Sequence, residues 1–362
     1  MGRAYLRTSA MVACVVGCVA GAPHAAVWQQ WPGPFVGDVE CLGLVGGRFL
    51  AGTWGGGMYV RDATTWQRQP SLPANVVSDI SAAGGDTVFA ASWSPGVFRS
   101  VDAGTSWSLV CDVGDYTLED DQPRRLAVLG PIVLVGTVLG ALLRSADRGE
   151  TWRDLTADTT MPRELLNPQC FLRAGSATYV GASRGVCRST DDGRSWELWA
   201  PRLGDATAYG KIYSLEARGD RIWAGTYQNG VWATDDSGGT WLPCTSGYRY
   251  VGGDWRYATA RDLLAVSDST LYCATGGGLS ISRDGGASWV NVEAASDGSA
   301  MHASALALDS SGSVWCGTTG GVYASRDNGQ TWEPLSGGMS AGLMTNVAVT
   351  TDGIFATHWY SG

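Results

Sequence analysis

Acidic residues gather in one stretch of the chain and are the first candidates for chemistry. They are Asp112, Asp115, Glu119, Asp120 and Asp121, and Arg124 and Arg125 follow them. Two carboxylates can hydrolyse a glycosidic bond when they lie ~5 to 9.5 Å apart, and carboxylate oxygens also suit Ca²⁺. Charged side chains in a loop are more often simply solvated. Hydrolysis, a calcium site at 112–121 and a solvated loop therefore all stay open at the level of sequence.

A second stretch mixes aromatic, basic and acidic residues: Tyr248, Arg249, Tyr250, Asp254, Trp255 and Arg256. Histidine is too rare to build a metal site, because only His302 and His358 lie beyond the first 26 residues. Seven cysteines remain after Cys14 and Cys18, an odd number with no Cys-x-x-Cys pair, so no disulfide framework is predicted. Apart from calcium at the acidic loop, we expect no cofactor and no metal.

A repeated octapeptide predicts the elements that must position these residues. The pattern Ser/Thr-x-Asp-x-Gly-x-Ser/Thr-Trp, as in 189–196, recurs about every 45 residues, which is the length of a four-stranded propeller blade. Its chemistry is that of a tight hairpin. The Asp carboxylate can accept hydrogen bonds from backbone N–H groups one or two residues on, and the Gly takes positive φ. The Trp then begins a strand and buries its ring. A shorter copy without the glycine spans 61–66.

These octapeptides resemble Asp-box (BNR) repeats, which occur in sialidases, xyloglucan-hydrolysing glycosidases, sortilin-type receptors and a photosystem II assembly factor. The resemblance covers about residues 28 to 358. It implies an all-β fold, a β-propeller of four-stranded antiparallel blades, in which each box is a structural turn on the rim away from the ligand. The box residues to which that structural role transfers are Asp102, Trp107, Asp147, Trp152, Asp191, Trp196, Asp236, Trp241, Asp284, Trp289, Asp327 and Trp332.

The strand pattern gives seven complete Asp-box units between Val39 and Pro334 and a partial one at the ends. Residues 27–31 read as an extra fourth strand, and 346–351 and 354–357 as a first and second strand with no third. Pairing of the two ends in one blade would leave no open sheet edge. We therefore expect a single propeller domain at 27–362, with seven or eight blades. A chain truncated at the C-terminus is an alternative explanation of the missing strand.

One position is expected to form a ring at the mouth of this propeller. It directly follows the small residues that end each second strand, and its occupants are Trp54, Trp93, Val138, Arg184, Tyr227, Gly276, Thr319 and His358. Because the position varies from unit to unit, we predict that Trp54, Trp93, Arg184, Tyr227 and His358 bind ligand. Aromatic rings there could stack on sugars or grip peptide side chains. Alternatively, they only cover the blade ends.

The N-terminal segment predicts export. Arg3 and Arg7 precede an apolar stretch too short to span a membrane, so 1–26 reads as an export signal. The alternative is a bacterial lipoprotein box at 15–18, which would anchor Cys18 at the cell surface. We thus expect a secreted or periplasmic protein, or a lipoprotein, without a membrane span. The net charge of −9 becomes −11 once Arg3 and Arg7 are removed, which argues against nucleic acid as a partner. Lys211 is the only lysine.

Two classes of function follow. The first is a non-catalytic binding or scaffold propeller, expected to be a monomer, that recognises glycan or protein at its mouth. The second is a glycoside hydrolase of the sialidase or xyloglucanase type. A sialidase-like site would need three converging arginines, yet Arg184 is the only arginine at the ring position, and a xyloglucanase-type cleft needs two propellers. Both absences favour binding. A membrane-complex assembly factor is a third interpretation, by analogy with the photosystem protein.

Overall fold

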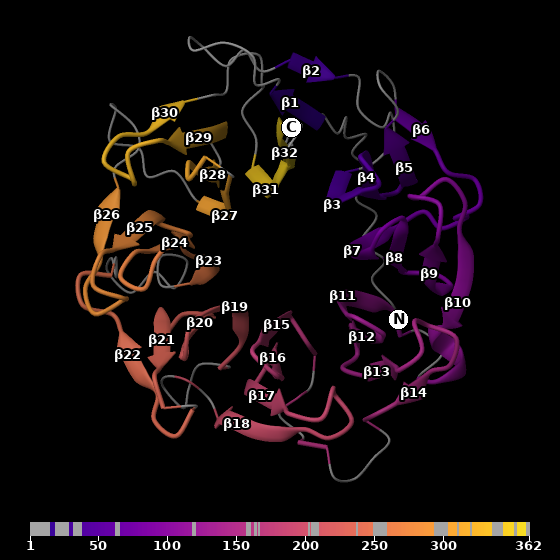
Figure 1. Cartoon of the computed structure of the whole chain (residues 1–362), viewed down its shortest axis with the longest axis horizontal. Coiled ribbons are helices and arrows are strands. Elements are labelled where there is room, and N and C mark those ends of the chain that lie inside the picture. The colour runs from indigo at the N-terminus through magenta and orange to yellow at the C-terminus, as the bar shows by residue number, and fades with distance from the viewer. Residues whose placement is uncertain are drawn as a thin grey trace, which may run out of the picture.

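Eight antiparallel sheets stand radially around a central axis in the computed structural model of this chain (Figure 1). The structure describes residues 15–18, 29–31, 38–61, 66–117, 121–156, 161–162, 165, 167–201, 203, 210–236, 238–248, 259–292, 303–309, 311–318, 321–334, 343–350 and 353–359. Each sheet has four strands. The fold is all-β, a β-propeller, as the sequence predicts. No helix in the described ranges is long and apolar enough to cross a bilayer.

Seven of the sheets, called blades 1 to 7, each use four consecutive strands, and the first strand of each blade lines the axis (Figure 1). Blade 1 comprises β3 (Asp38–Val45), β4 (Arg48–Trp54), β5 (Gly57–Arg61) and β6 (Trp66–Arg68). Blade 2 comprises β7 (Val77–Gly84), β8 (Thr87–Ser92), β9 (Gly96–Ser100) and β10 (Ser108–Asp112), followed by the 3₁₀ turn η1 (Val113–Asp115). Blade 3 comprises β11 (Pro123–Leu129), β12 (Ile132–Thr137), β13 (Leu142–Ser145) and β14 (Arg153–Asp154).

The next four blades repeat this order. Blade 4 comprises β15 (Cys170–Ala174), β16 (Ala177–Ala182), β17 (Gly185–Ser189) and β18 (Glu197–Pro201). Blade 5 comprises β19 (Ile212–Arg218), β20 (Arg221–Thr226), β21 (Val231–Thr234) and β22 (Leu242–Cys244). Blade 6 comprises β23 (Ala260–Ala265), β24 (Leu271–Thr275), β25 (Gly278–Ser282) and β26 (Val290–Val292). Blade 7 comprises β27 (Ala303–Leu308), β28 (Val314–Thr318), β29 (Gly321–Ser325) and β30 (Glu333–Pro334).

The eighth sheet joins the two ends of the chain. From the axis outward it contains β31 (Leu343–Thr350), β32 (Gly353–Trp359), β1 (Val15–Cys18) and β2 (Gln29–Trp31). The predicted extra fourth strand and the predicted first and second strands are therefore β2, β31 and β32. The third position is filled by β1, which pairs with β32 on one side and β2 on the other. This strand falls inside the segment that the sequence predicts to be an export signal.

The hydrophobic core lies between blades, and each interblade core contains one box tryptophan. Trp107 of blade 2 belongs to a cluster with Leu50, Met58 and Leu72, which precede it in blade 1 or in the connection from that blade. Trp152 of blade 3 likewise packs with Phe89 and other side chains of blade 2. The same arrangement recurs around the ring with Trp196, Trp241, Trp289 and Trp332. Each large ring thus stabilises the contact of its own blade with the preceding one.

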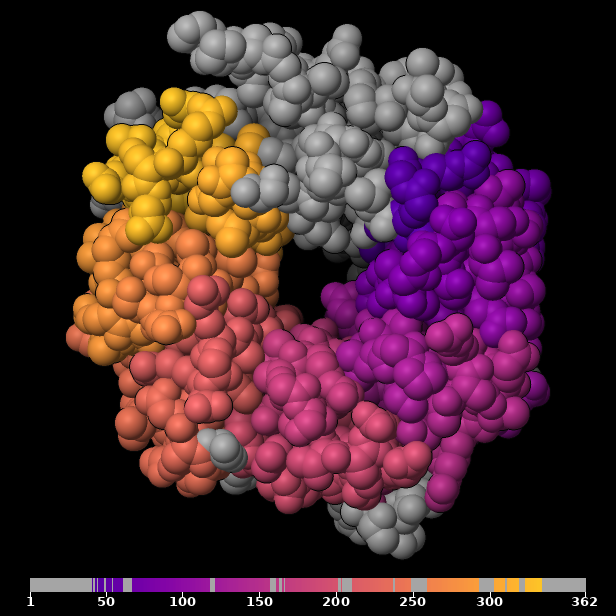
Figure 2. All heavy atoms as spheres, viewed as in Figure 1, coloured from indigo at the N-terminus to yellow at the C-terminus, as the bar shows by residue number. Residues whose placement is uncertain are grey.

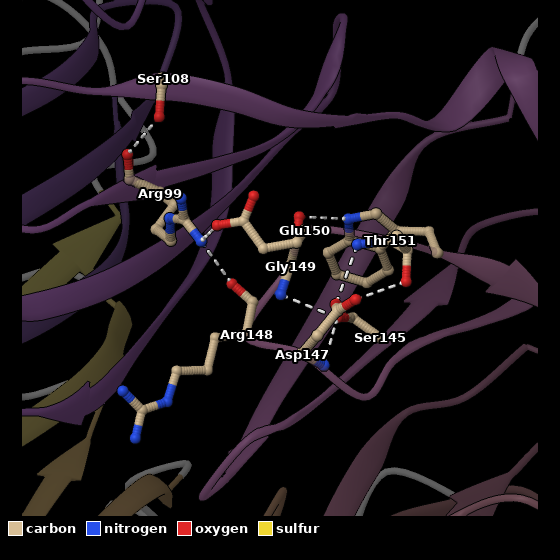
Figure 3. Close-up of polar contacts among 9 residues, drawn as sticks. Arg99, Ser108, Ser145, Asp147, Arg148, Gly149, Glu150 and Thr151 are labelled. Atoms are coloured by element: carbon tan, nitrogen blue, oxygen red, sulfur yellow. Dashed lines mark hydrogen bonds and ion pairs between the residues drawn. The ribbon is translucent and has the colours of Figure 1, made fainter.

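The Asp box of blade 3 shows how the octapeptide makes its turn (Figure 3). Ser145 Oγ donates to Asp147 Oδ1 at 2.7 Å and accepts from the Gly149 N–H at 2.7 Å. The Asp147 carboxylate accepts from the Thr151 N–H at 2.9 Å and from the Thr151 hydroxyl at 2.5 Å. The Trp152 indole N–H donates to Gly149 O at 3.1 Å. The carboxylate thus holds donors four residues on, not one or two as the sequence suggested, because the turn is a wider loop.

The box glycine is not the only residue with positive φ. Arg148 and Gly149 have φ of 59° and 87°, and the equivalent Ala103 and Asp192 also have positive φ. The carbonyl oxygen of the first of these two residues accepts a hydrogen bond from an arginine of the preceding blade. Arg99 of β9 donates through Nη1 to Arg148 O at 2.8 Å and pairs with Glu150 Oε1 at 2.6 Å (Figure 3). Arg144 of β13 makes the same bond to Asp192 O at 2.8 Å. The boxes therefore connect neighbouring blades through hydrogen bonds and an ion pair.

Small residues in the second strands allow the blades to approach closely. A Cβ added at Gly52 would lie 2.5 Å from Cys41 Sγ and 2.6 Å from Val77 Cγ1 of the next blade. At the equivalent Gly181, it would lie 2.5 Å from Cys170 Sγ and 2.7 Å from Ile212 Cγ2. No side chain fits at this point. The seven cysteines from Cys41 to Cys316 form no disulfide, and all but Cys170 are buried. Burial raises the pKa of Cys273 to about 12.

Buried carboxylates add hydrogen bonds between first strands. Asp79 of β7 accepts from the Leu126 N–H of β11 at 2.8 Å, and Asp262 of β23 accepts from the Leu306 N–H of β27 at 2.8 Å. Glu216 of β19 accepts from the Ala265 N–H of β23 at 3.2 Å. Burial raises the pKa of all three carboxyls, and that of Asp262 to about 7. By contrast, hydrogen bonds from Thr151 and Ser145 lower the pKa of Asp147 to about 2.

Replacing a box tryptophan should open an interblade core. We expect Trp152→Ala to lower the free energy of unfolding by about 3–5 kcal/mol, because it leaves a large cavity. Val101→Ala is the control, since Val101 is 65% exposed in the neighbouring box and its loss should change stability by less than about 0.5 kcal/mol. Denaturant melts of both variants measure the difference. Equal stability of Trp152→Ala and wild type would contradict the structural role of the box.

The raised pKa of Asp262 predicts a pH-dependent stability. Between the ordinary pKa of 3.8 and about 7, the folded protein holds a proton that the unfolded chain has released. The free energy of unfolding should therefore fall as pH rises through this window, by up to about 1.4 kcal/mol per pH unit for one group. Asp262→Asn should flatten this slope, because the amide does not titrate. The exposed Asp268→Asn should leave the slope unchanged. An unaltered slope in Asp262→Asn would show that this carboxyl does not titrate there.

Export should remove β1 from the closing blade. Cleavage near residue 26 deletes the whole strand, and processing at a lipidated Cys18 leaves only its last residue. We expect intact-mass measurement of the exported protein to show one of these two N-termini. Hydrogen exchange should then be faster in β31 and β32 than in β7 and β8, because β32 has lost a neighbour. Exported protein that retains residues 15–18 would instead contradict the signal and make β1 a permanent strand.

Candidate functional site

The two faces of the ring are built from different loops. On one face, the Gly55 and Gly57 N–H groups of a second-to-third-strand turn both donate to Asn75 O, in the connection that enters blade 2, at 2.7 and 3.0 Å. On the other face, the Ala103 N–H of an Asp box donates to Asp86 O, in a first-to-second-strand turn, at 2.9 Å. We call these the mouth face and the box face. The space-filling view shows the hollow at the centre of the ring (Figure 2).

The threonine that ends a second strand fixes the mouth-face turn. Thr53 Oγ1 donates to Gly57 O at 2.8 Å and accepts from the Gly56 N–H at 3.1 Å. Thr226 Oγ1 makes the equivalent bond to Gly230 O at 2.7 Å. The repeated Ala-Gly-Thr pattern is therefore structural, and it sets the height at which the next residue enters the mouth.

A ring of β-bulges surrounds the inner edge of the mouth face. The first strands of blades 1, 2, 3, 5, 6, 7 and the closing blade each carry one extra residue near their start. A bulge redirects a side chain at the rim of a sheet. The seven bulge residues are Glu40, Ser78, Arg124, Tyr213, Arg261, Ser304 and Thr345. The three large side chains among the described ones are Arg124, Tyr213 and Arg261, on blades 3, 5 and 6.

In three blades, the residue that follows the end of the second strand makes the same backbone hydrogen bond. The N–H groups of Trp93, Val138 and Tyr227 each donate to the residue that precedes or opens the first strand of the same blade: Val76 O at 3.1 Å, Gln122 O at 2.8 Å and Lys211 O at 2.8 Å. The side chains of Trp93 and Tyr227 are half-buried. All three residues thus lie on the mouth face.

Strand register shifts two of the five predicted residues by one position. Ala182 pairs with Gly185 as Thr53 pairs with Gly57, so Ser183 occupies the ring position, and Arg184 lies one residue further along a shorter turn, where it is exposed. In the closing blade, Leu343 pairs with Trp359 as Asp38 pairs with Trp54. His358 therefore lies one residue before the ring position. The side chains of Trp54 and His358 lie outside the described part of the structure.

Tyr227 meets a cluster that the sequence analysis did not single out. Its ring centroid is 5.8 Å from that of Tyr213, at an interplanar angle of 55°. The Lys211 ammonium lies 4.9 Å from the Tyr213 centroid, on the other side of the cluster. Burial raises the pKa of Tyr213, and the neighbouring Tyr227 raises it further. Burial, and then the charges of Arg124 and Arg125, lower the pKa of Lys211.

Two arginines of blade 3, Arg124 and Arg125, lie near enough to this cluster for their charges to lower the pKa of Lys211. Arg125 donates through Nε to Gln169 O of the connection to blade 4 at 3.2 Å, and through Nη1 to Arg124 O at 3.3 Å. The guanidinium is therefore held in place by backbone carbonyls. Arg261 of blade 6 is close enough to influence the pKa of Tyr213, as is Arg124. Charges from three blades thus converge on one aromatic pair.

The acidic loop is partly explained by local hydrogen bonding. Asp121 is buried, and it accepts from the Thr137 hydroxyl at 2.6 Å and the Leu139 N–H at 2.8 Å. Asp112 accepts from the Gly114 N–H at 3.1 Å and caps η1. Glu119 and Asp120 lie outside the described residues. Within the described ranges, no group of three or more His, Cys, Asp or Glu side chains could hold a metal ion. Calcium binding at 112–121 stays a prediction.

The second candidate stretch has a core residue at its start. Tyr248 is buried, its hydroxyl lies 3.4 Å from Cys273 Sγ, and its ring meets Trp289 edge-on at 5.8 Å. Tyr248 therefore packs between blades 5 and 6. The remaining residues of the stretch, 249–256, lie outside the described ranges.

Two sequence signals could have revealed the cluster of blades 3, 5 and 6. Lys211 is the only lysine in the chain and directly precedes a first strand. In addition, Arg124, Tyr213 and Arg261 share one position when the first strands are aligned. This shared position is hard to find from the sequence alone, because a bulge cannot be recognised from the alternation of apolar and polar residues.

Comparison with known proteins gives the fold. No protein-family model matches the chain, and the search of curated proteins found no match. Among solved structures, YCF48 bound to a D1 peptide is 16% identical, with a TM-score of 0.55 over 79% of this chain and 92% of the other. The computationally designed Ika8 protein is 15% identical, with a TM-score of 0.60 and coverages of 90% and 96%. The extracellular domain of BT4673 from B. thetaiotaomicron is 17% identical, with a TM-score of 0.57 over 79% of this chain and 38% of that one. At these identities, the similarity establishes the propeller fold alone.

Proposed function

We propose that this chain, whose structure is that of an Asp-box β-propeller, is a non-catalytic binding or scaffold protein of the extracytoplasmic space. It recognises a glycan or protein ligand at the centre of its mouth face. The observation that carries the proposal is the contrast between the two faces. Box-face side chains repeat from blade to blade and are used in turns and interblade hydrogen bonds, whereas the side chains at the ring and bulge positions of the mouth face vary among the blades.

The variation at the mouth matches the needs of a single ligand. Trp93 and Tyr227 occupy the same backbone position as Val138, and the bulge residues include Tyr213 on one blade and Ser304 on another. A purely structural ring in an eightfold repeat has no reason to vary in this way. Half-buried tyrosine and tryptophan rings supply large contact areas at low cost in side-chain entropy.

Carboxylate chemistry supports binding over hydrolysis. Four described carboxylates on or beside the inner strands, those of Asp79, Asp121, Glu216 and Asp262, accept backbone N–H groups at 2.8–3.2 Å. A glycoside hydrolase needs two carboxylates that face the scissile bond from opposite sides. Side chains that are occupied with the backbone of neighbouring strands are poorly suited to that role. A glycoside hydrolase is the alternative that the following experiment distinguishes.

Truncation of mouth rings should weaken binding and leave the fold intact. Wild type, Trp93→Ala and Tyr227→Ala are applied to an array of glycans and peptides, and hits are followed by calorimetry. We expect each substitution to cost about 1–3 kcal/mol of binding, taking ring stacking on nucleobases as the scale.

Leu242→Ala is the matched control, because Leu242 is 62% exposed on the outermost strand of the blade that carries Tyr227. Its binding should equal that of wild type. Equal binding by all four proteins would place the ligand elsewhere and refute the proposal. Release of reducing sugar from a bound glycan would replace it with the hydrolase interpretation.

A further inference from the structure

Positive charge is concentrated on one side of the mouth in a chain that is acidic overall. Arg124 and Arg125 enter from blade 3, Lys211 from blade 5 and Arg261 from blade 6, and we call these four residues the basic arc. The exposed Arg184 lies on the mouth face of blade 4, between them. The full chain has a net charge of −9 and one lysine, and that lysine belongs to the arc.

The positive charges of the basic arc repel one another. Burial, and then the charges of Arg124 and Arg125, lower the pKa of Lys211, so these like charges disfavour one another. Proteins commonly relieve such repulsion with a carboxylate, as for Arg218, which pairs with Asp268 at 3.0 Å at the far end of the Lys211 strand. Within the described ranges, no ion pair includes Lys211 or Arg261.

Nearby acids do not supply the missing negative charge. Asp79 lies close enough to Arg125 to interact with it, but burial raises the pKa of Asp79, which favours its neutral form. Its two oxygens also accept the N–H groups of Ile80 and Leu126, at 3.0 and 2.8 Å. Asp112 and Asp115 lie on the mouth face as well, but they follow the outermost strand β10. Among the described residues, none of these three carboxylates forms an ion pair with Lys211 or Arg261.

Aromatic rings lie directly beside these charges. Tyr213 has Lys211 Nζ at 4.9 Å from its centroid and the tilted ring of Tyr227 at 5.8 Å. A ring that faces a sugar contacts its C–H face, while a neighbouring ammonium or guanidinium reaches a carboxylate on the edge of the same sugar. Cations on three blades can then meet carboxylates on successive sugar units.

We infer that the basic arc, with Tyr213 and Tyr227, binds a carboxylate-bearing oligosaccharide, that is, a glycan containing uronic acids. The inference rests on the proposed mouth-binding function and names its ligand class. The aromatic rings beside the charges favour a sugar over an acidic peptide, since a flexible peptide carboxylate needs no flat surface there. The net negative charge elsewhere would repel the same ligand and so confine it to the mouth.

The single lysine permits a test without mutation. Purified protein is treated with an amine-reactive acetylating ester, with and without tetragalacturonate, and Lys211 acetylation is measured by peptide mass spectrometry. The lowered pKa of Lys211 leaves more neutral amine to react. We expect tetragalacturonate to protect Lys211 and its methyl ester, which has the same backbone without charge, to give no protection. Added salt should reduce the protection.

Affinity measurements with variants complete the test. Lys211→Gln should bind tetragalacturonate at least about 10-fold more weakly, as expected for the loss of a charged hydrogen bond. Arg218→Gln removes one positive charge from the opposite end of the same strand and should bind like wild type. No binding of tetragalacturonate by wild type, equal binding of the ester, or unchanged affinity in Lys211→Gln overturns the inference. Binding of hexaglutamate in its place, lost in Lys211→Gln, also overturns it in favour of an acidic peptide.

Tyr227→Ala separates this inference from the proposed function. A neutral array ligand that is lost in Tyr227→Ala but kept in Lys211→Gln would preserve mouth binding and refute the uronate class. Tetragalacturonate binding that is unchanged in both variants would refute mouth binding itself.

Discussion

Packing of one blade against the next is the constraint on which this structure depends. A four-stranded sheet buries little by itself, and in this chain the apolar clusters lie between sheets, each with a tryptophan from an Asp box. The box has to hold that ring at a fixed height, which it does through a carboxylate, two hydroxyls and the indole N–H. The arginine of the previous blade then bonds to the turn itself. Turn geometry and core packing are therefore one cooperative unit.

Because the box face supplies these turns and interblade contacts, the residues of the mouth face are free to vary. Mouth-face turns need only a threonine hydroxyl and a glycine to close, so the residue that follows can be tryptophan, valine or tyrosine without cost to the fold. The β-bulges add a second ring of variable side chains on the innermost strands. Residues at the mouth can therefore vary independently of the box residues, which lie at the opposite ends of the blades.

The pKa shifts of the carboxylates also differ between the Asp boxes and the inner strands. Box carboxylates are hydrogen-bonded in their charged form, and the pKa of Asp147 and Asp327 is lowered to about 2, first by the threonine hydroxyl and then by its N–H. Their contribution to stability is present above the ordinary pKa and is lost as pH falls toward 2. Buried carboxylates between first strands behave in the opposite way, because desolvation dominates.

The sequence by itself determined the all-β propeller, the repeat boundaries and the structural role of the box, because each depends on local turn chemistry and on a period about 45 residues long. It also identified the strands of the closing blade except the third. Only the tertiary structure decided what the mouth contains. Arg184 lies one residue beyond the ring position because its turn is shorter, and strand pairing places His358 one residue before that position. Arg124, Tyr213 and Arg261, far apart along the chain, meet because strands of different blades share one axis, and no local pattern encodes that meeting.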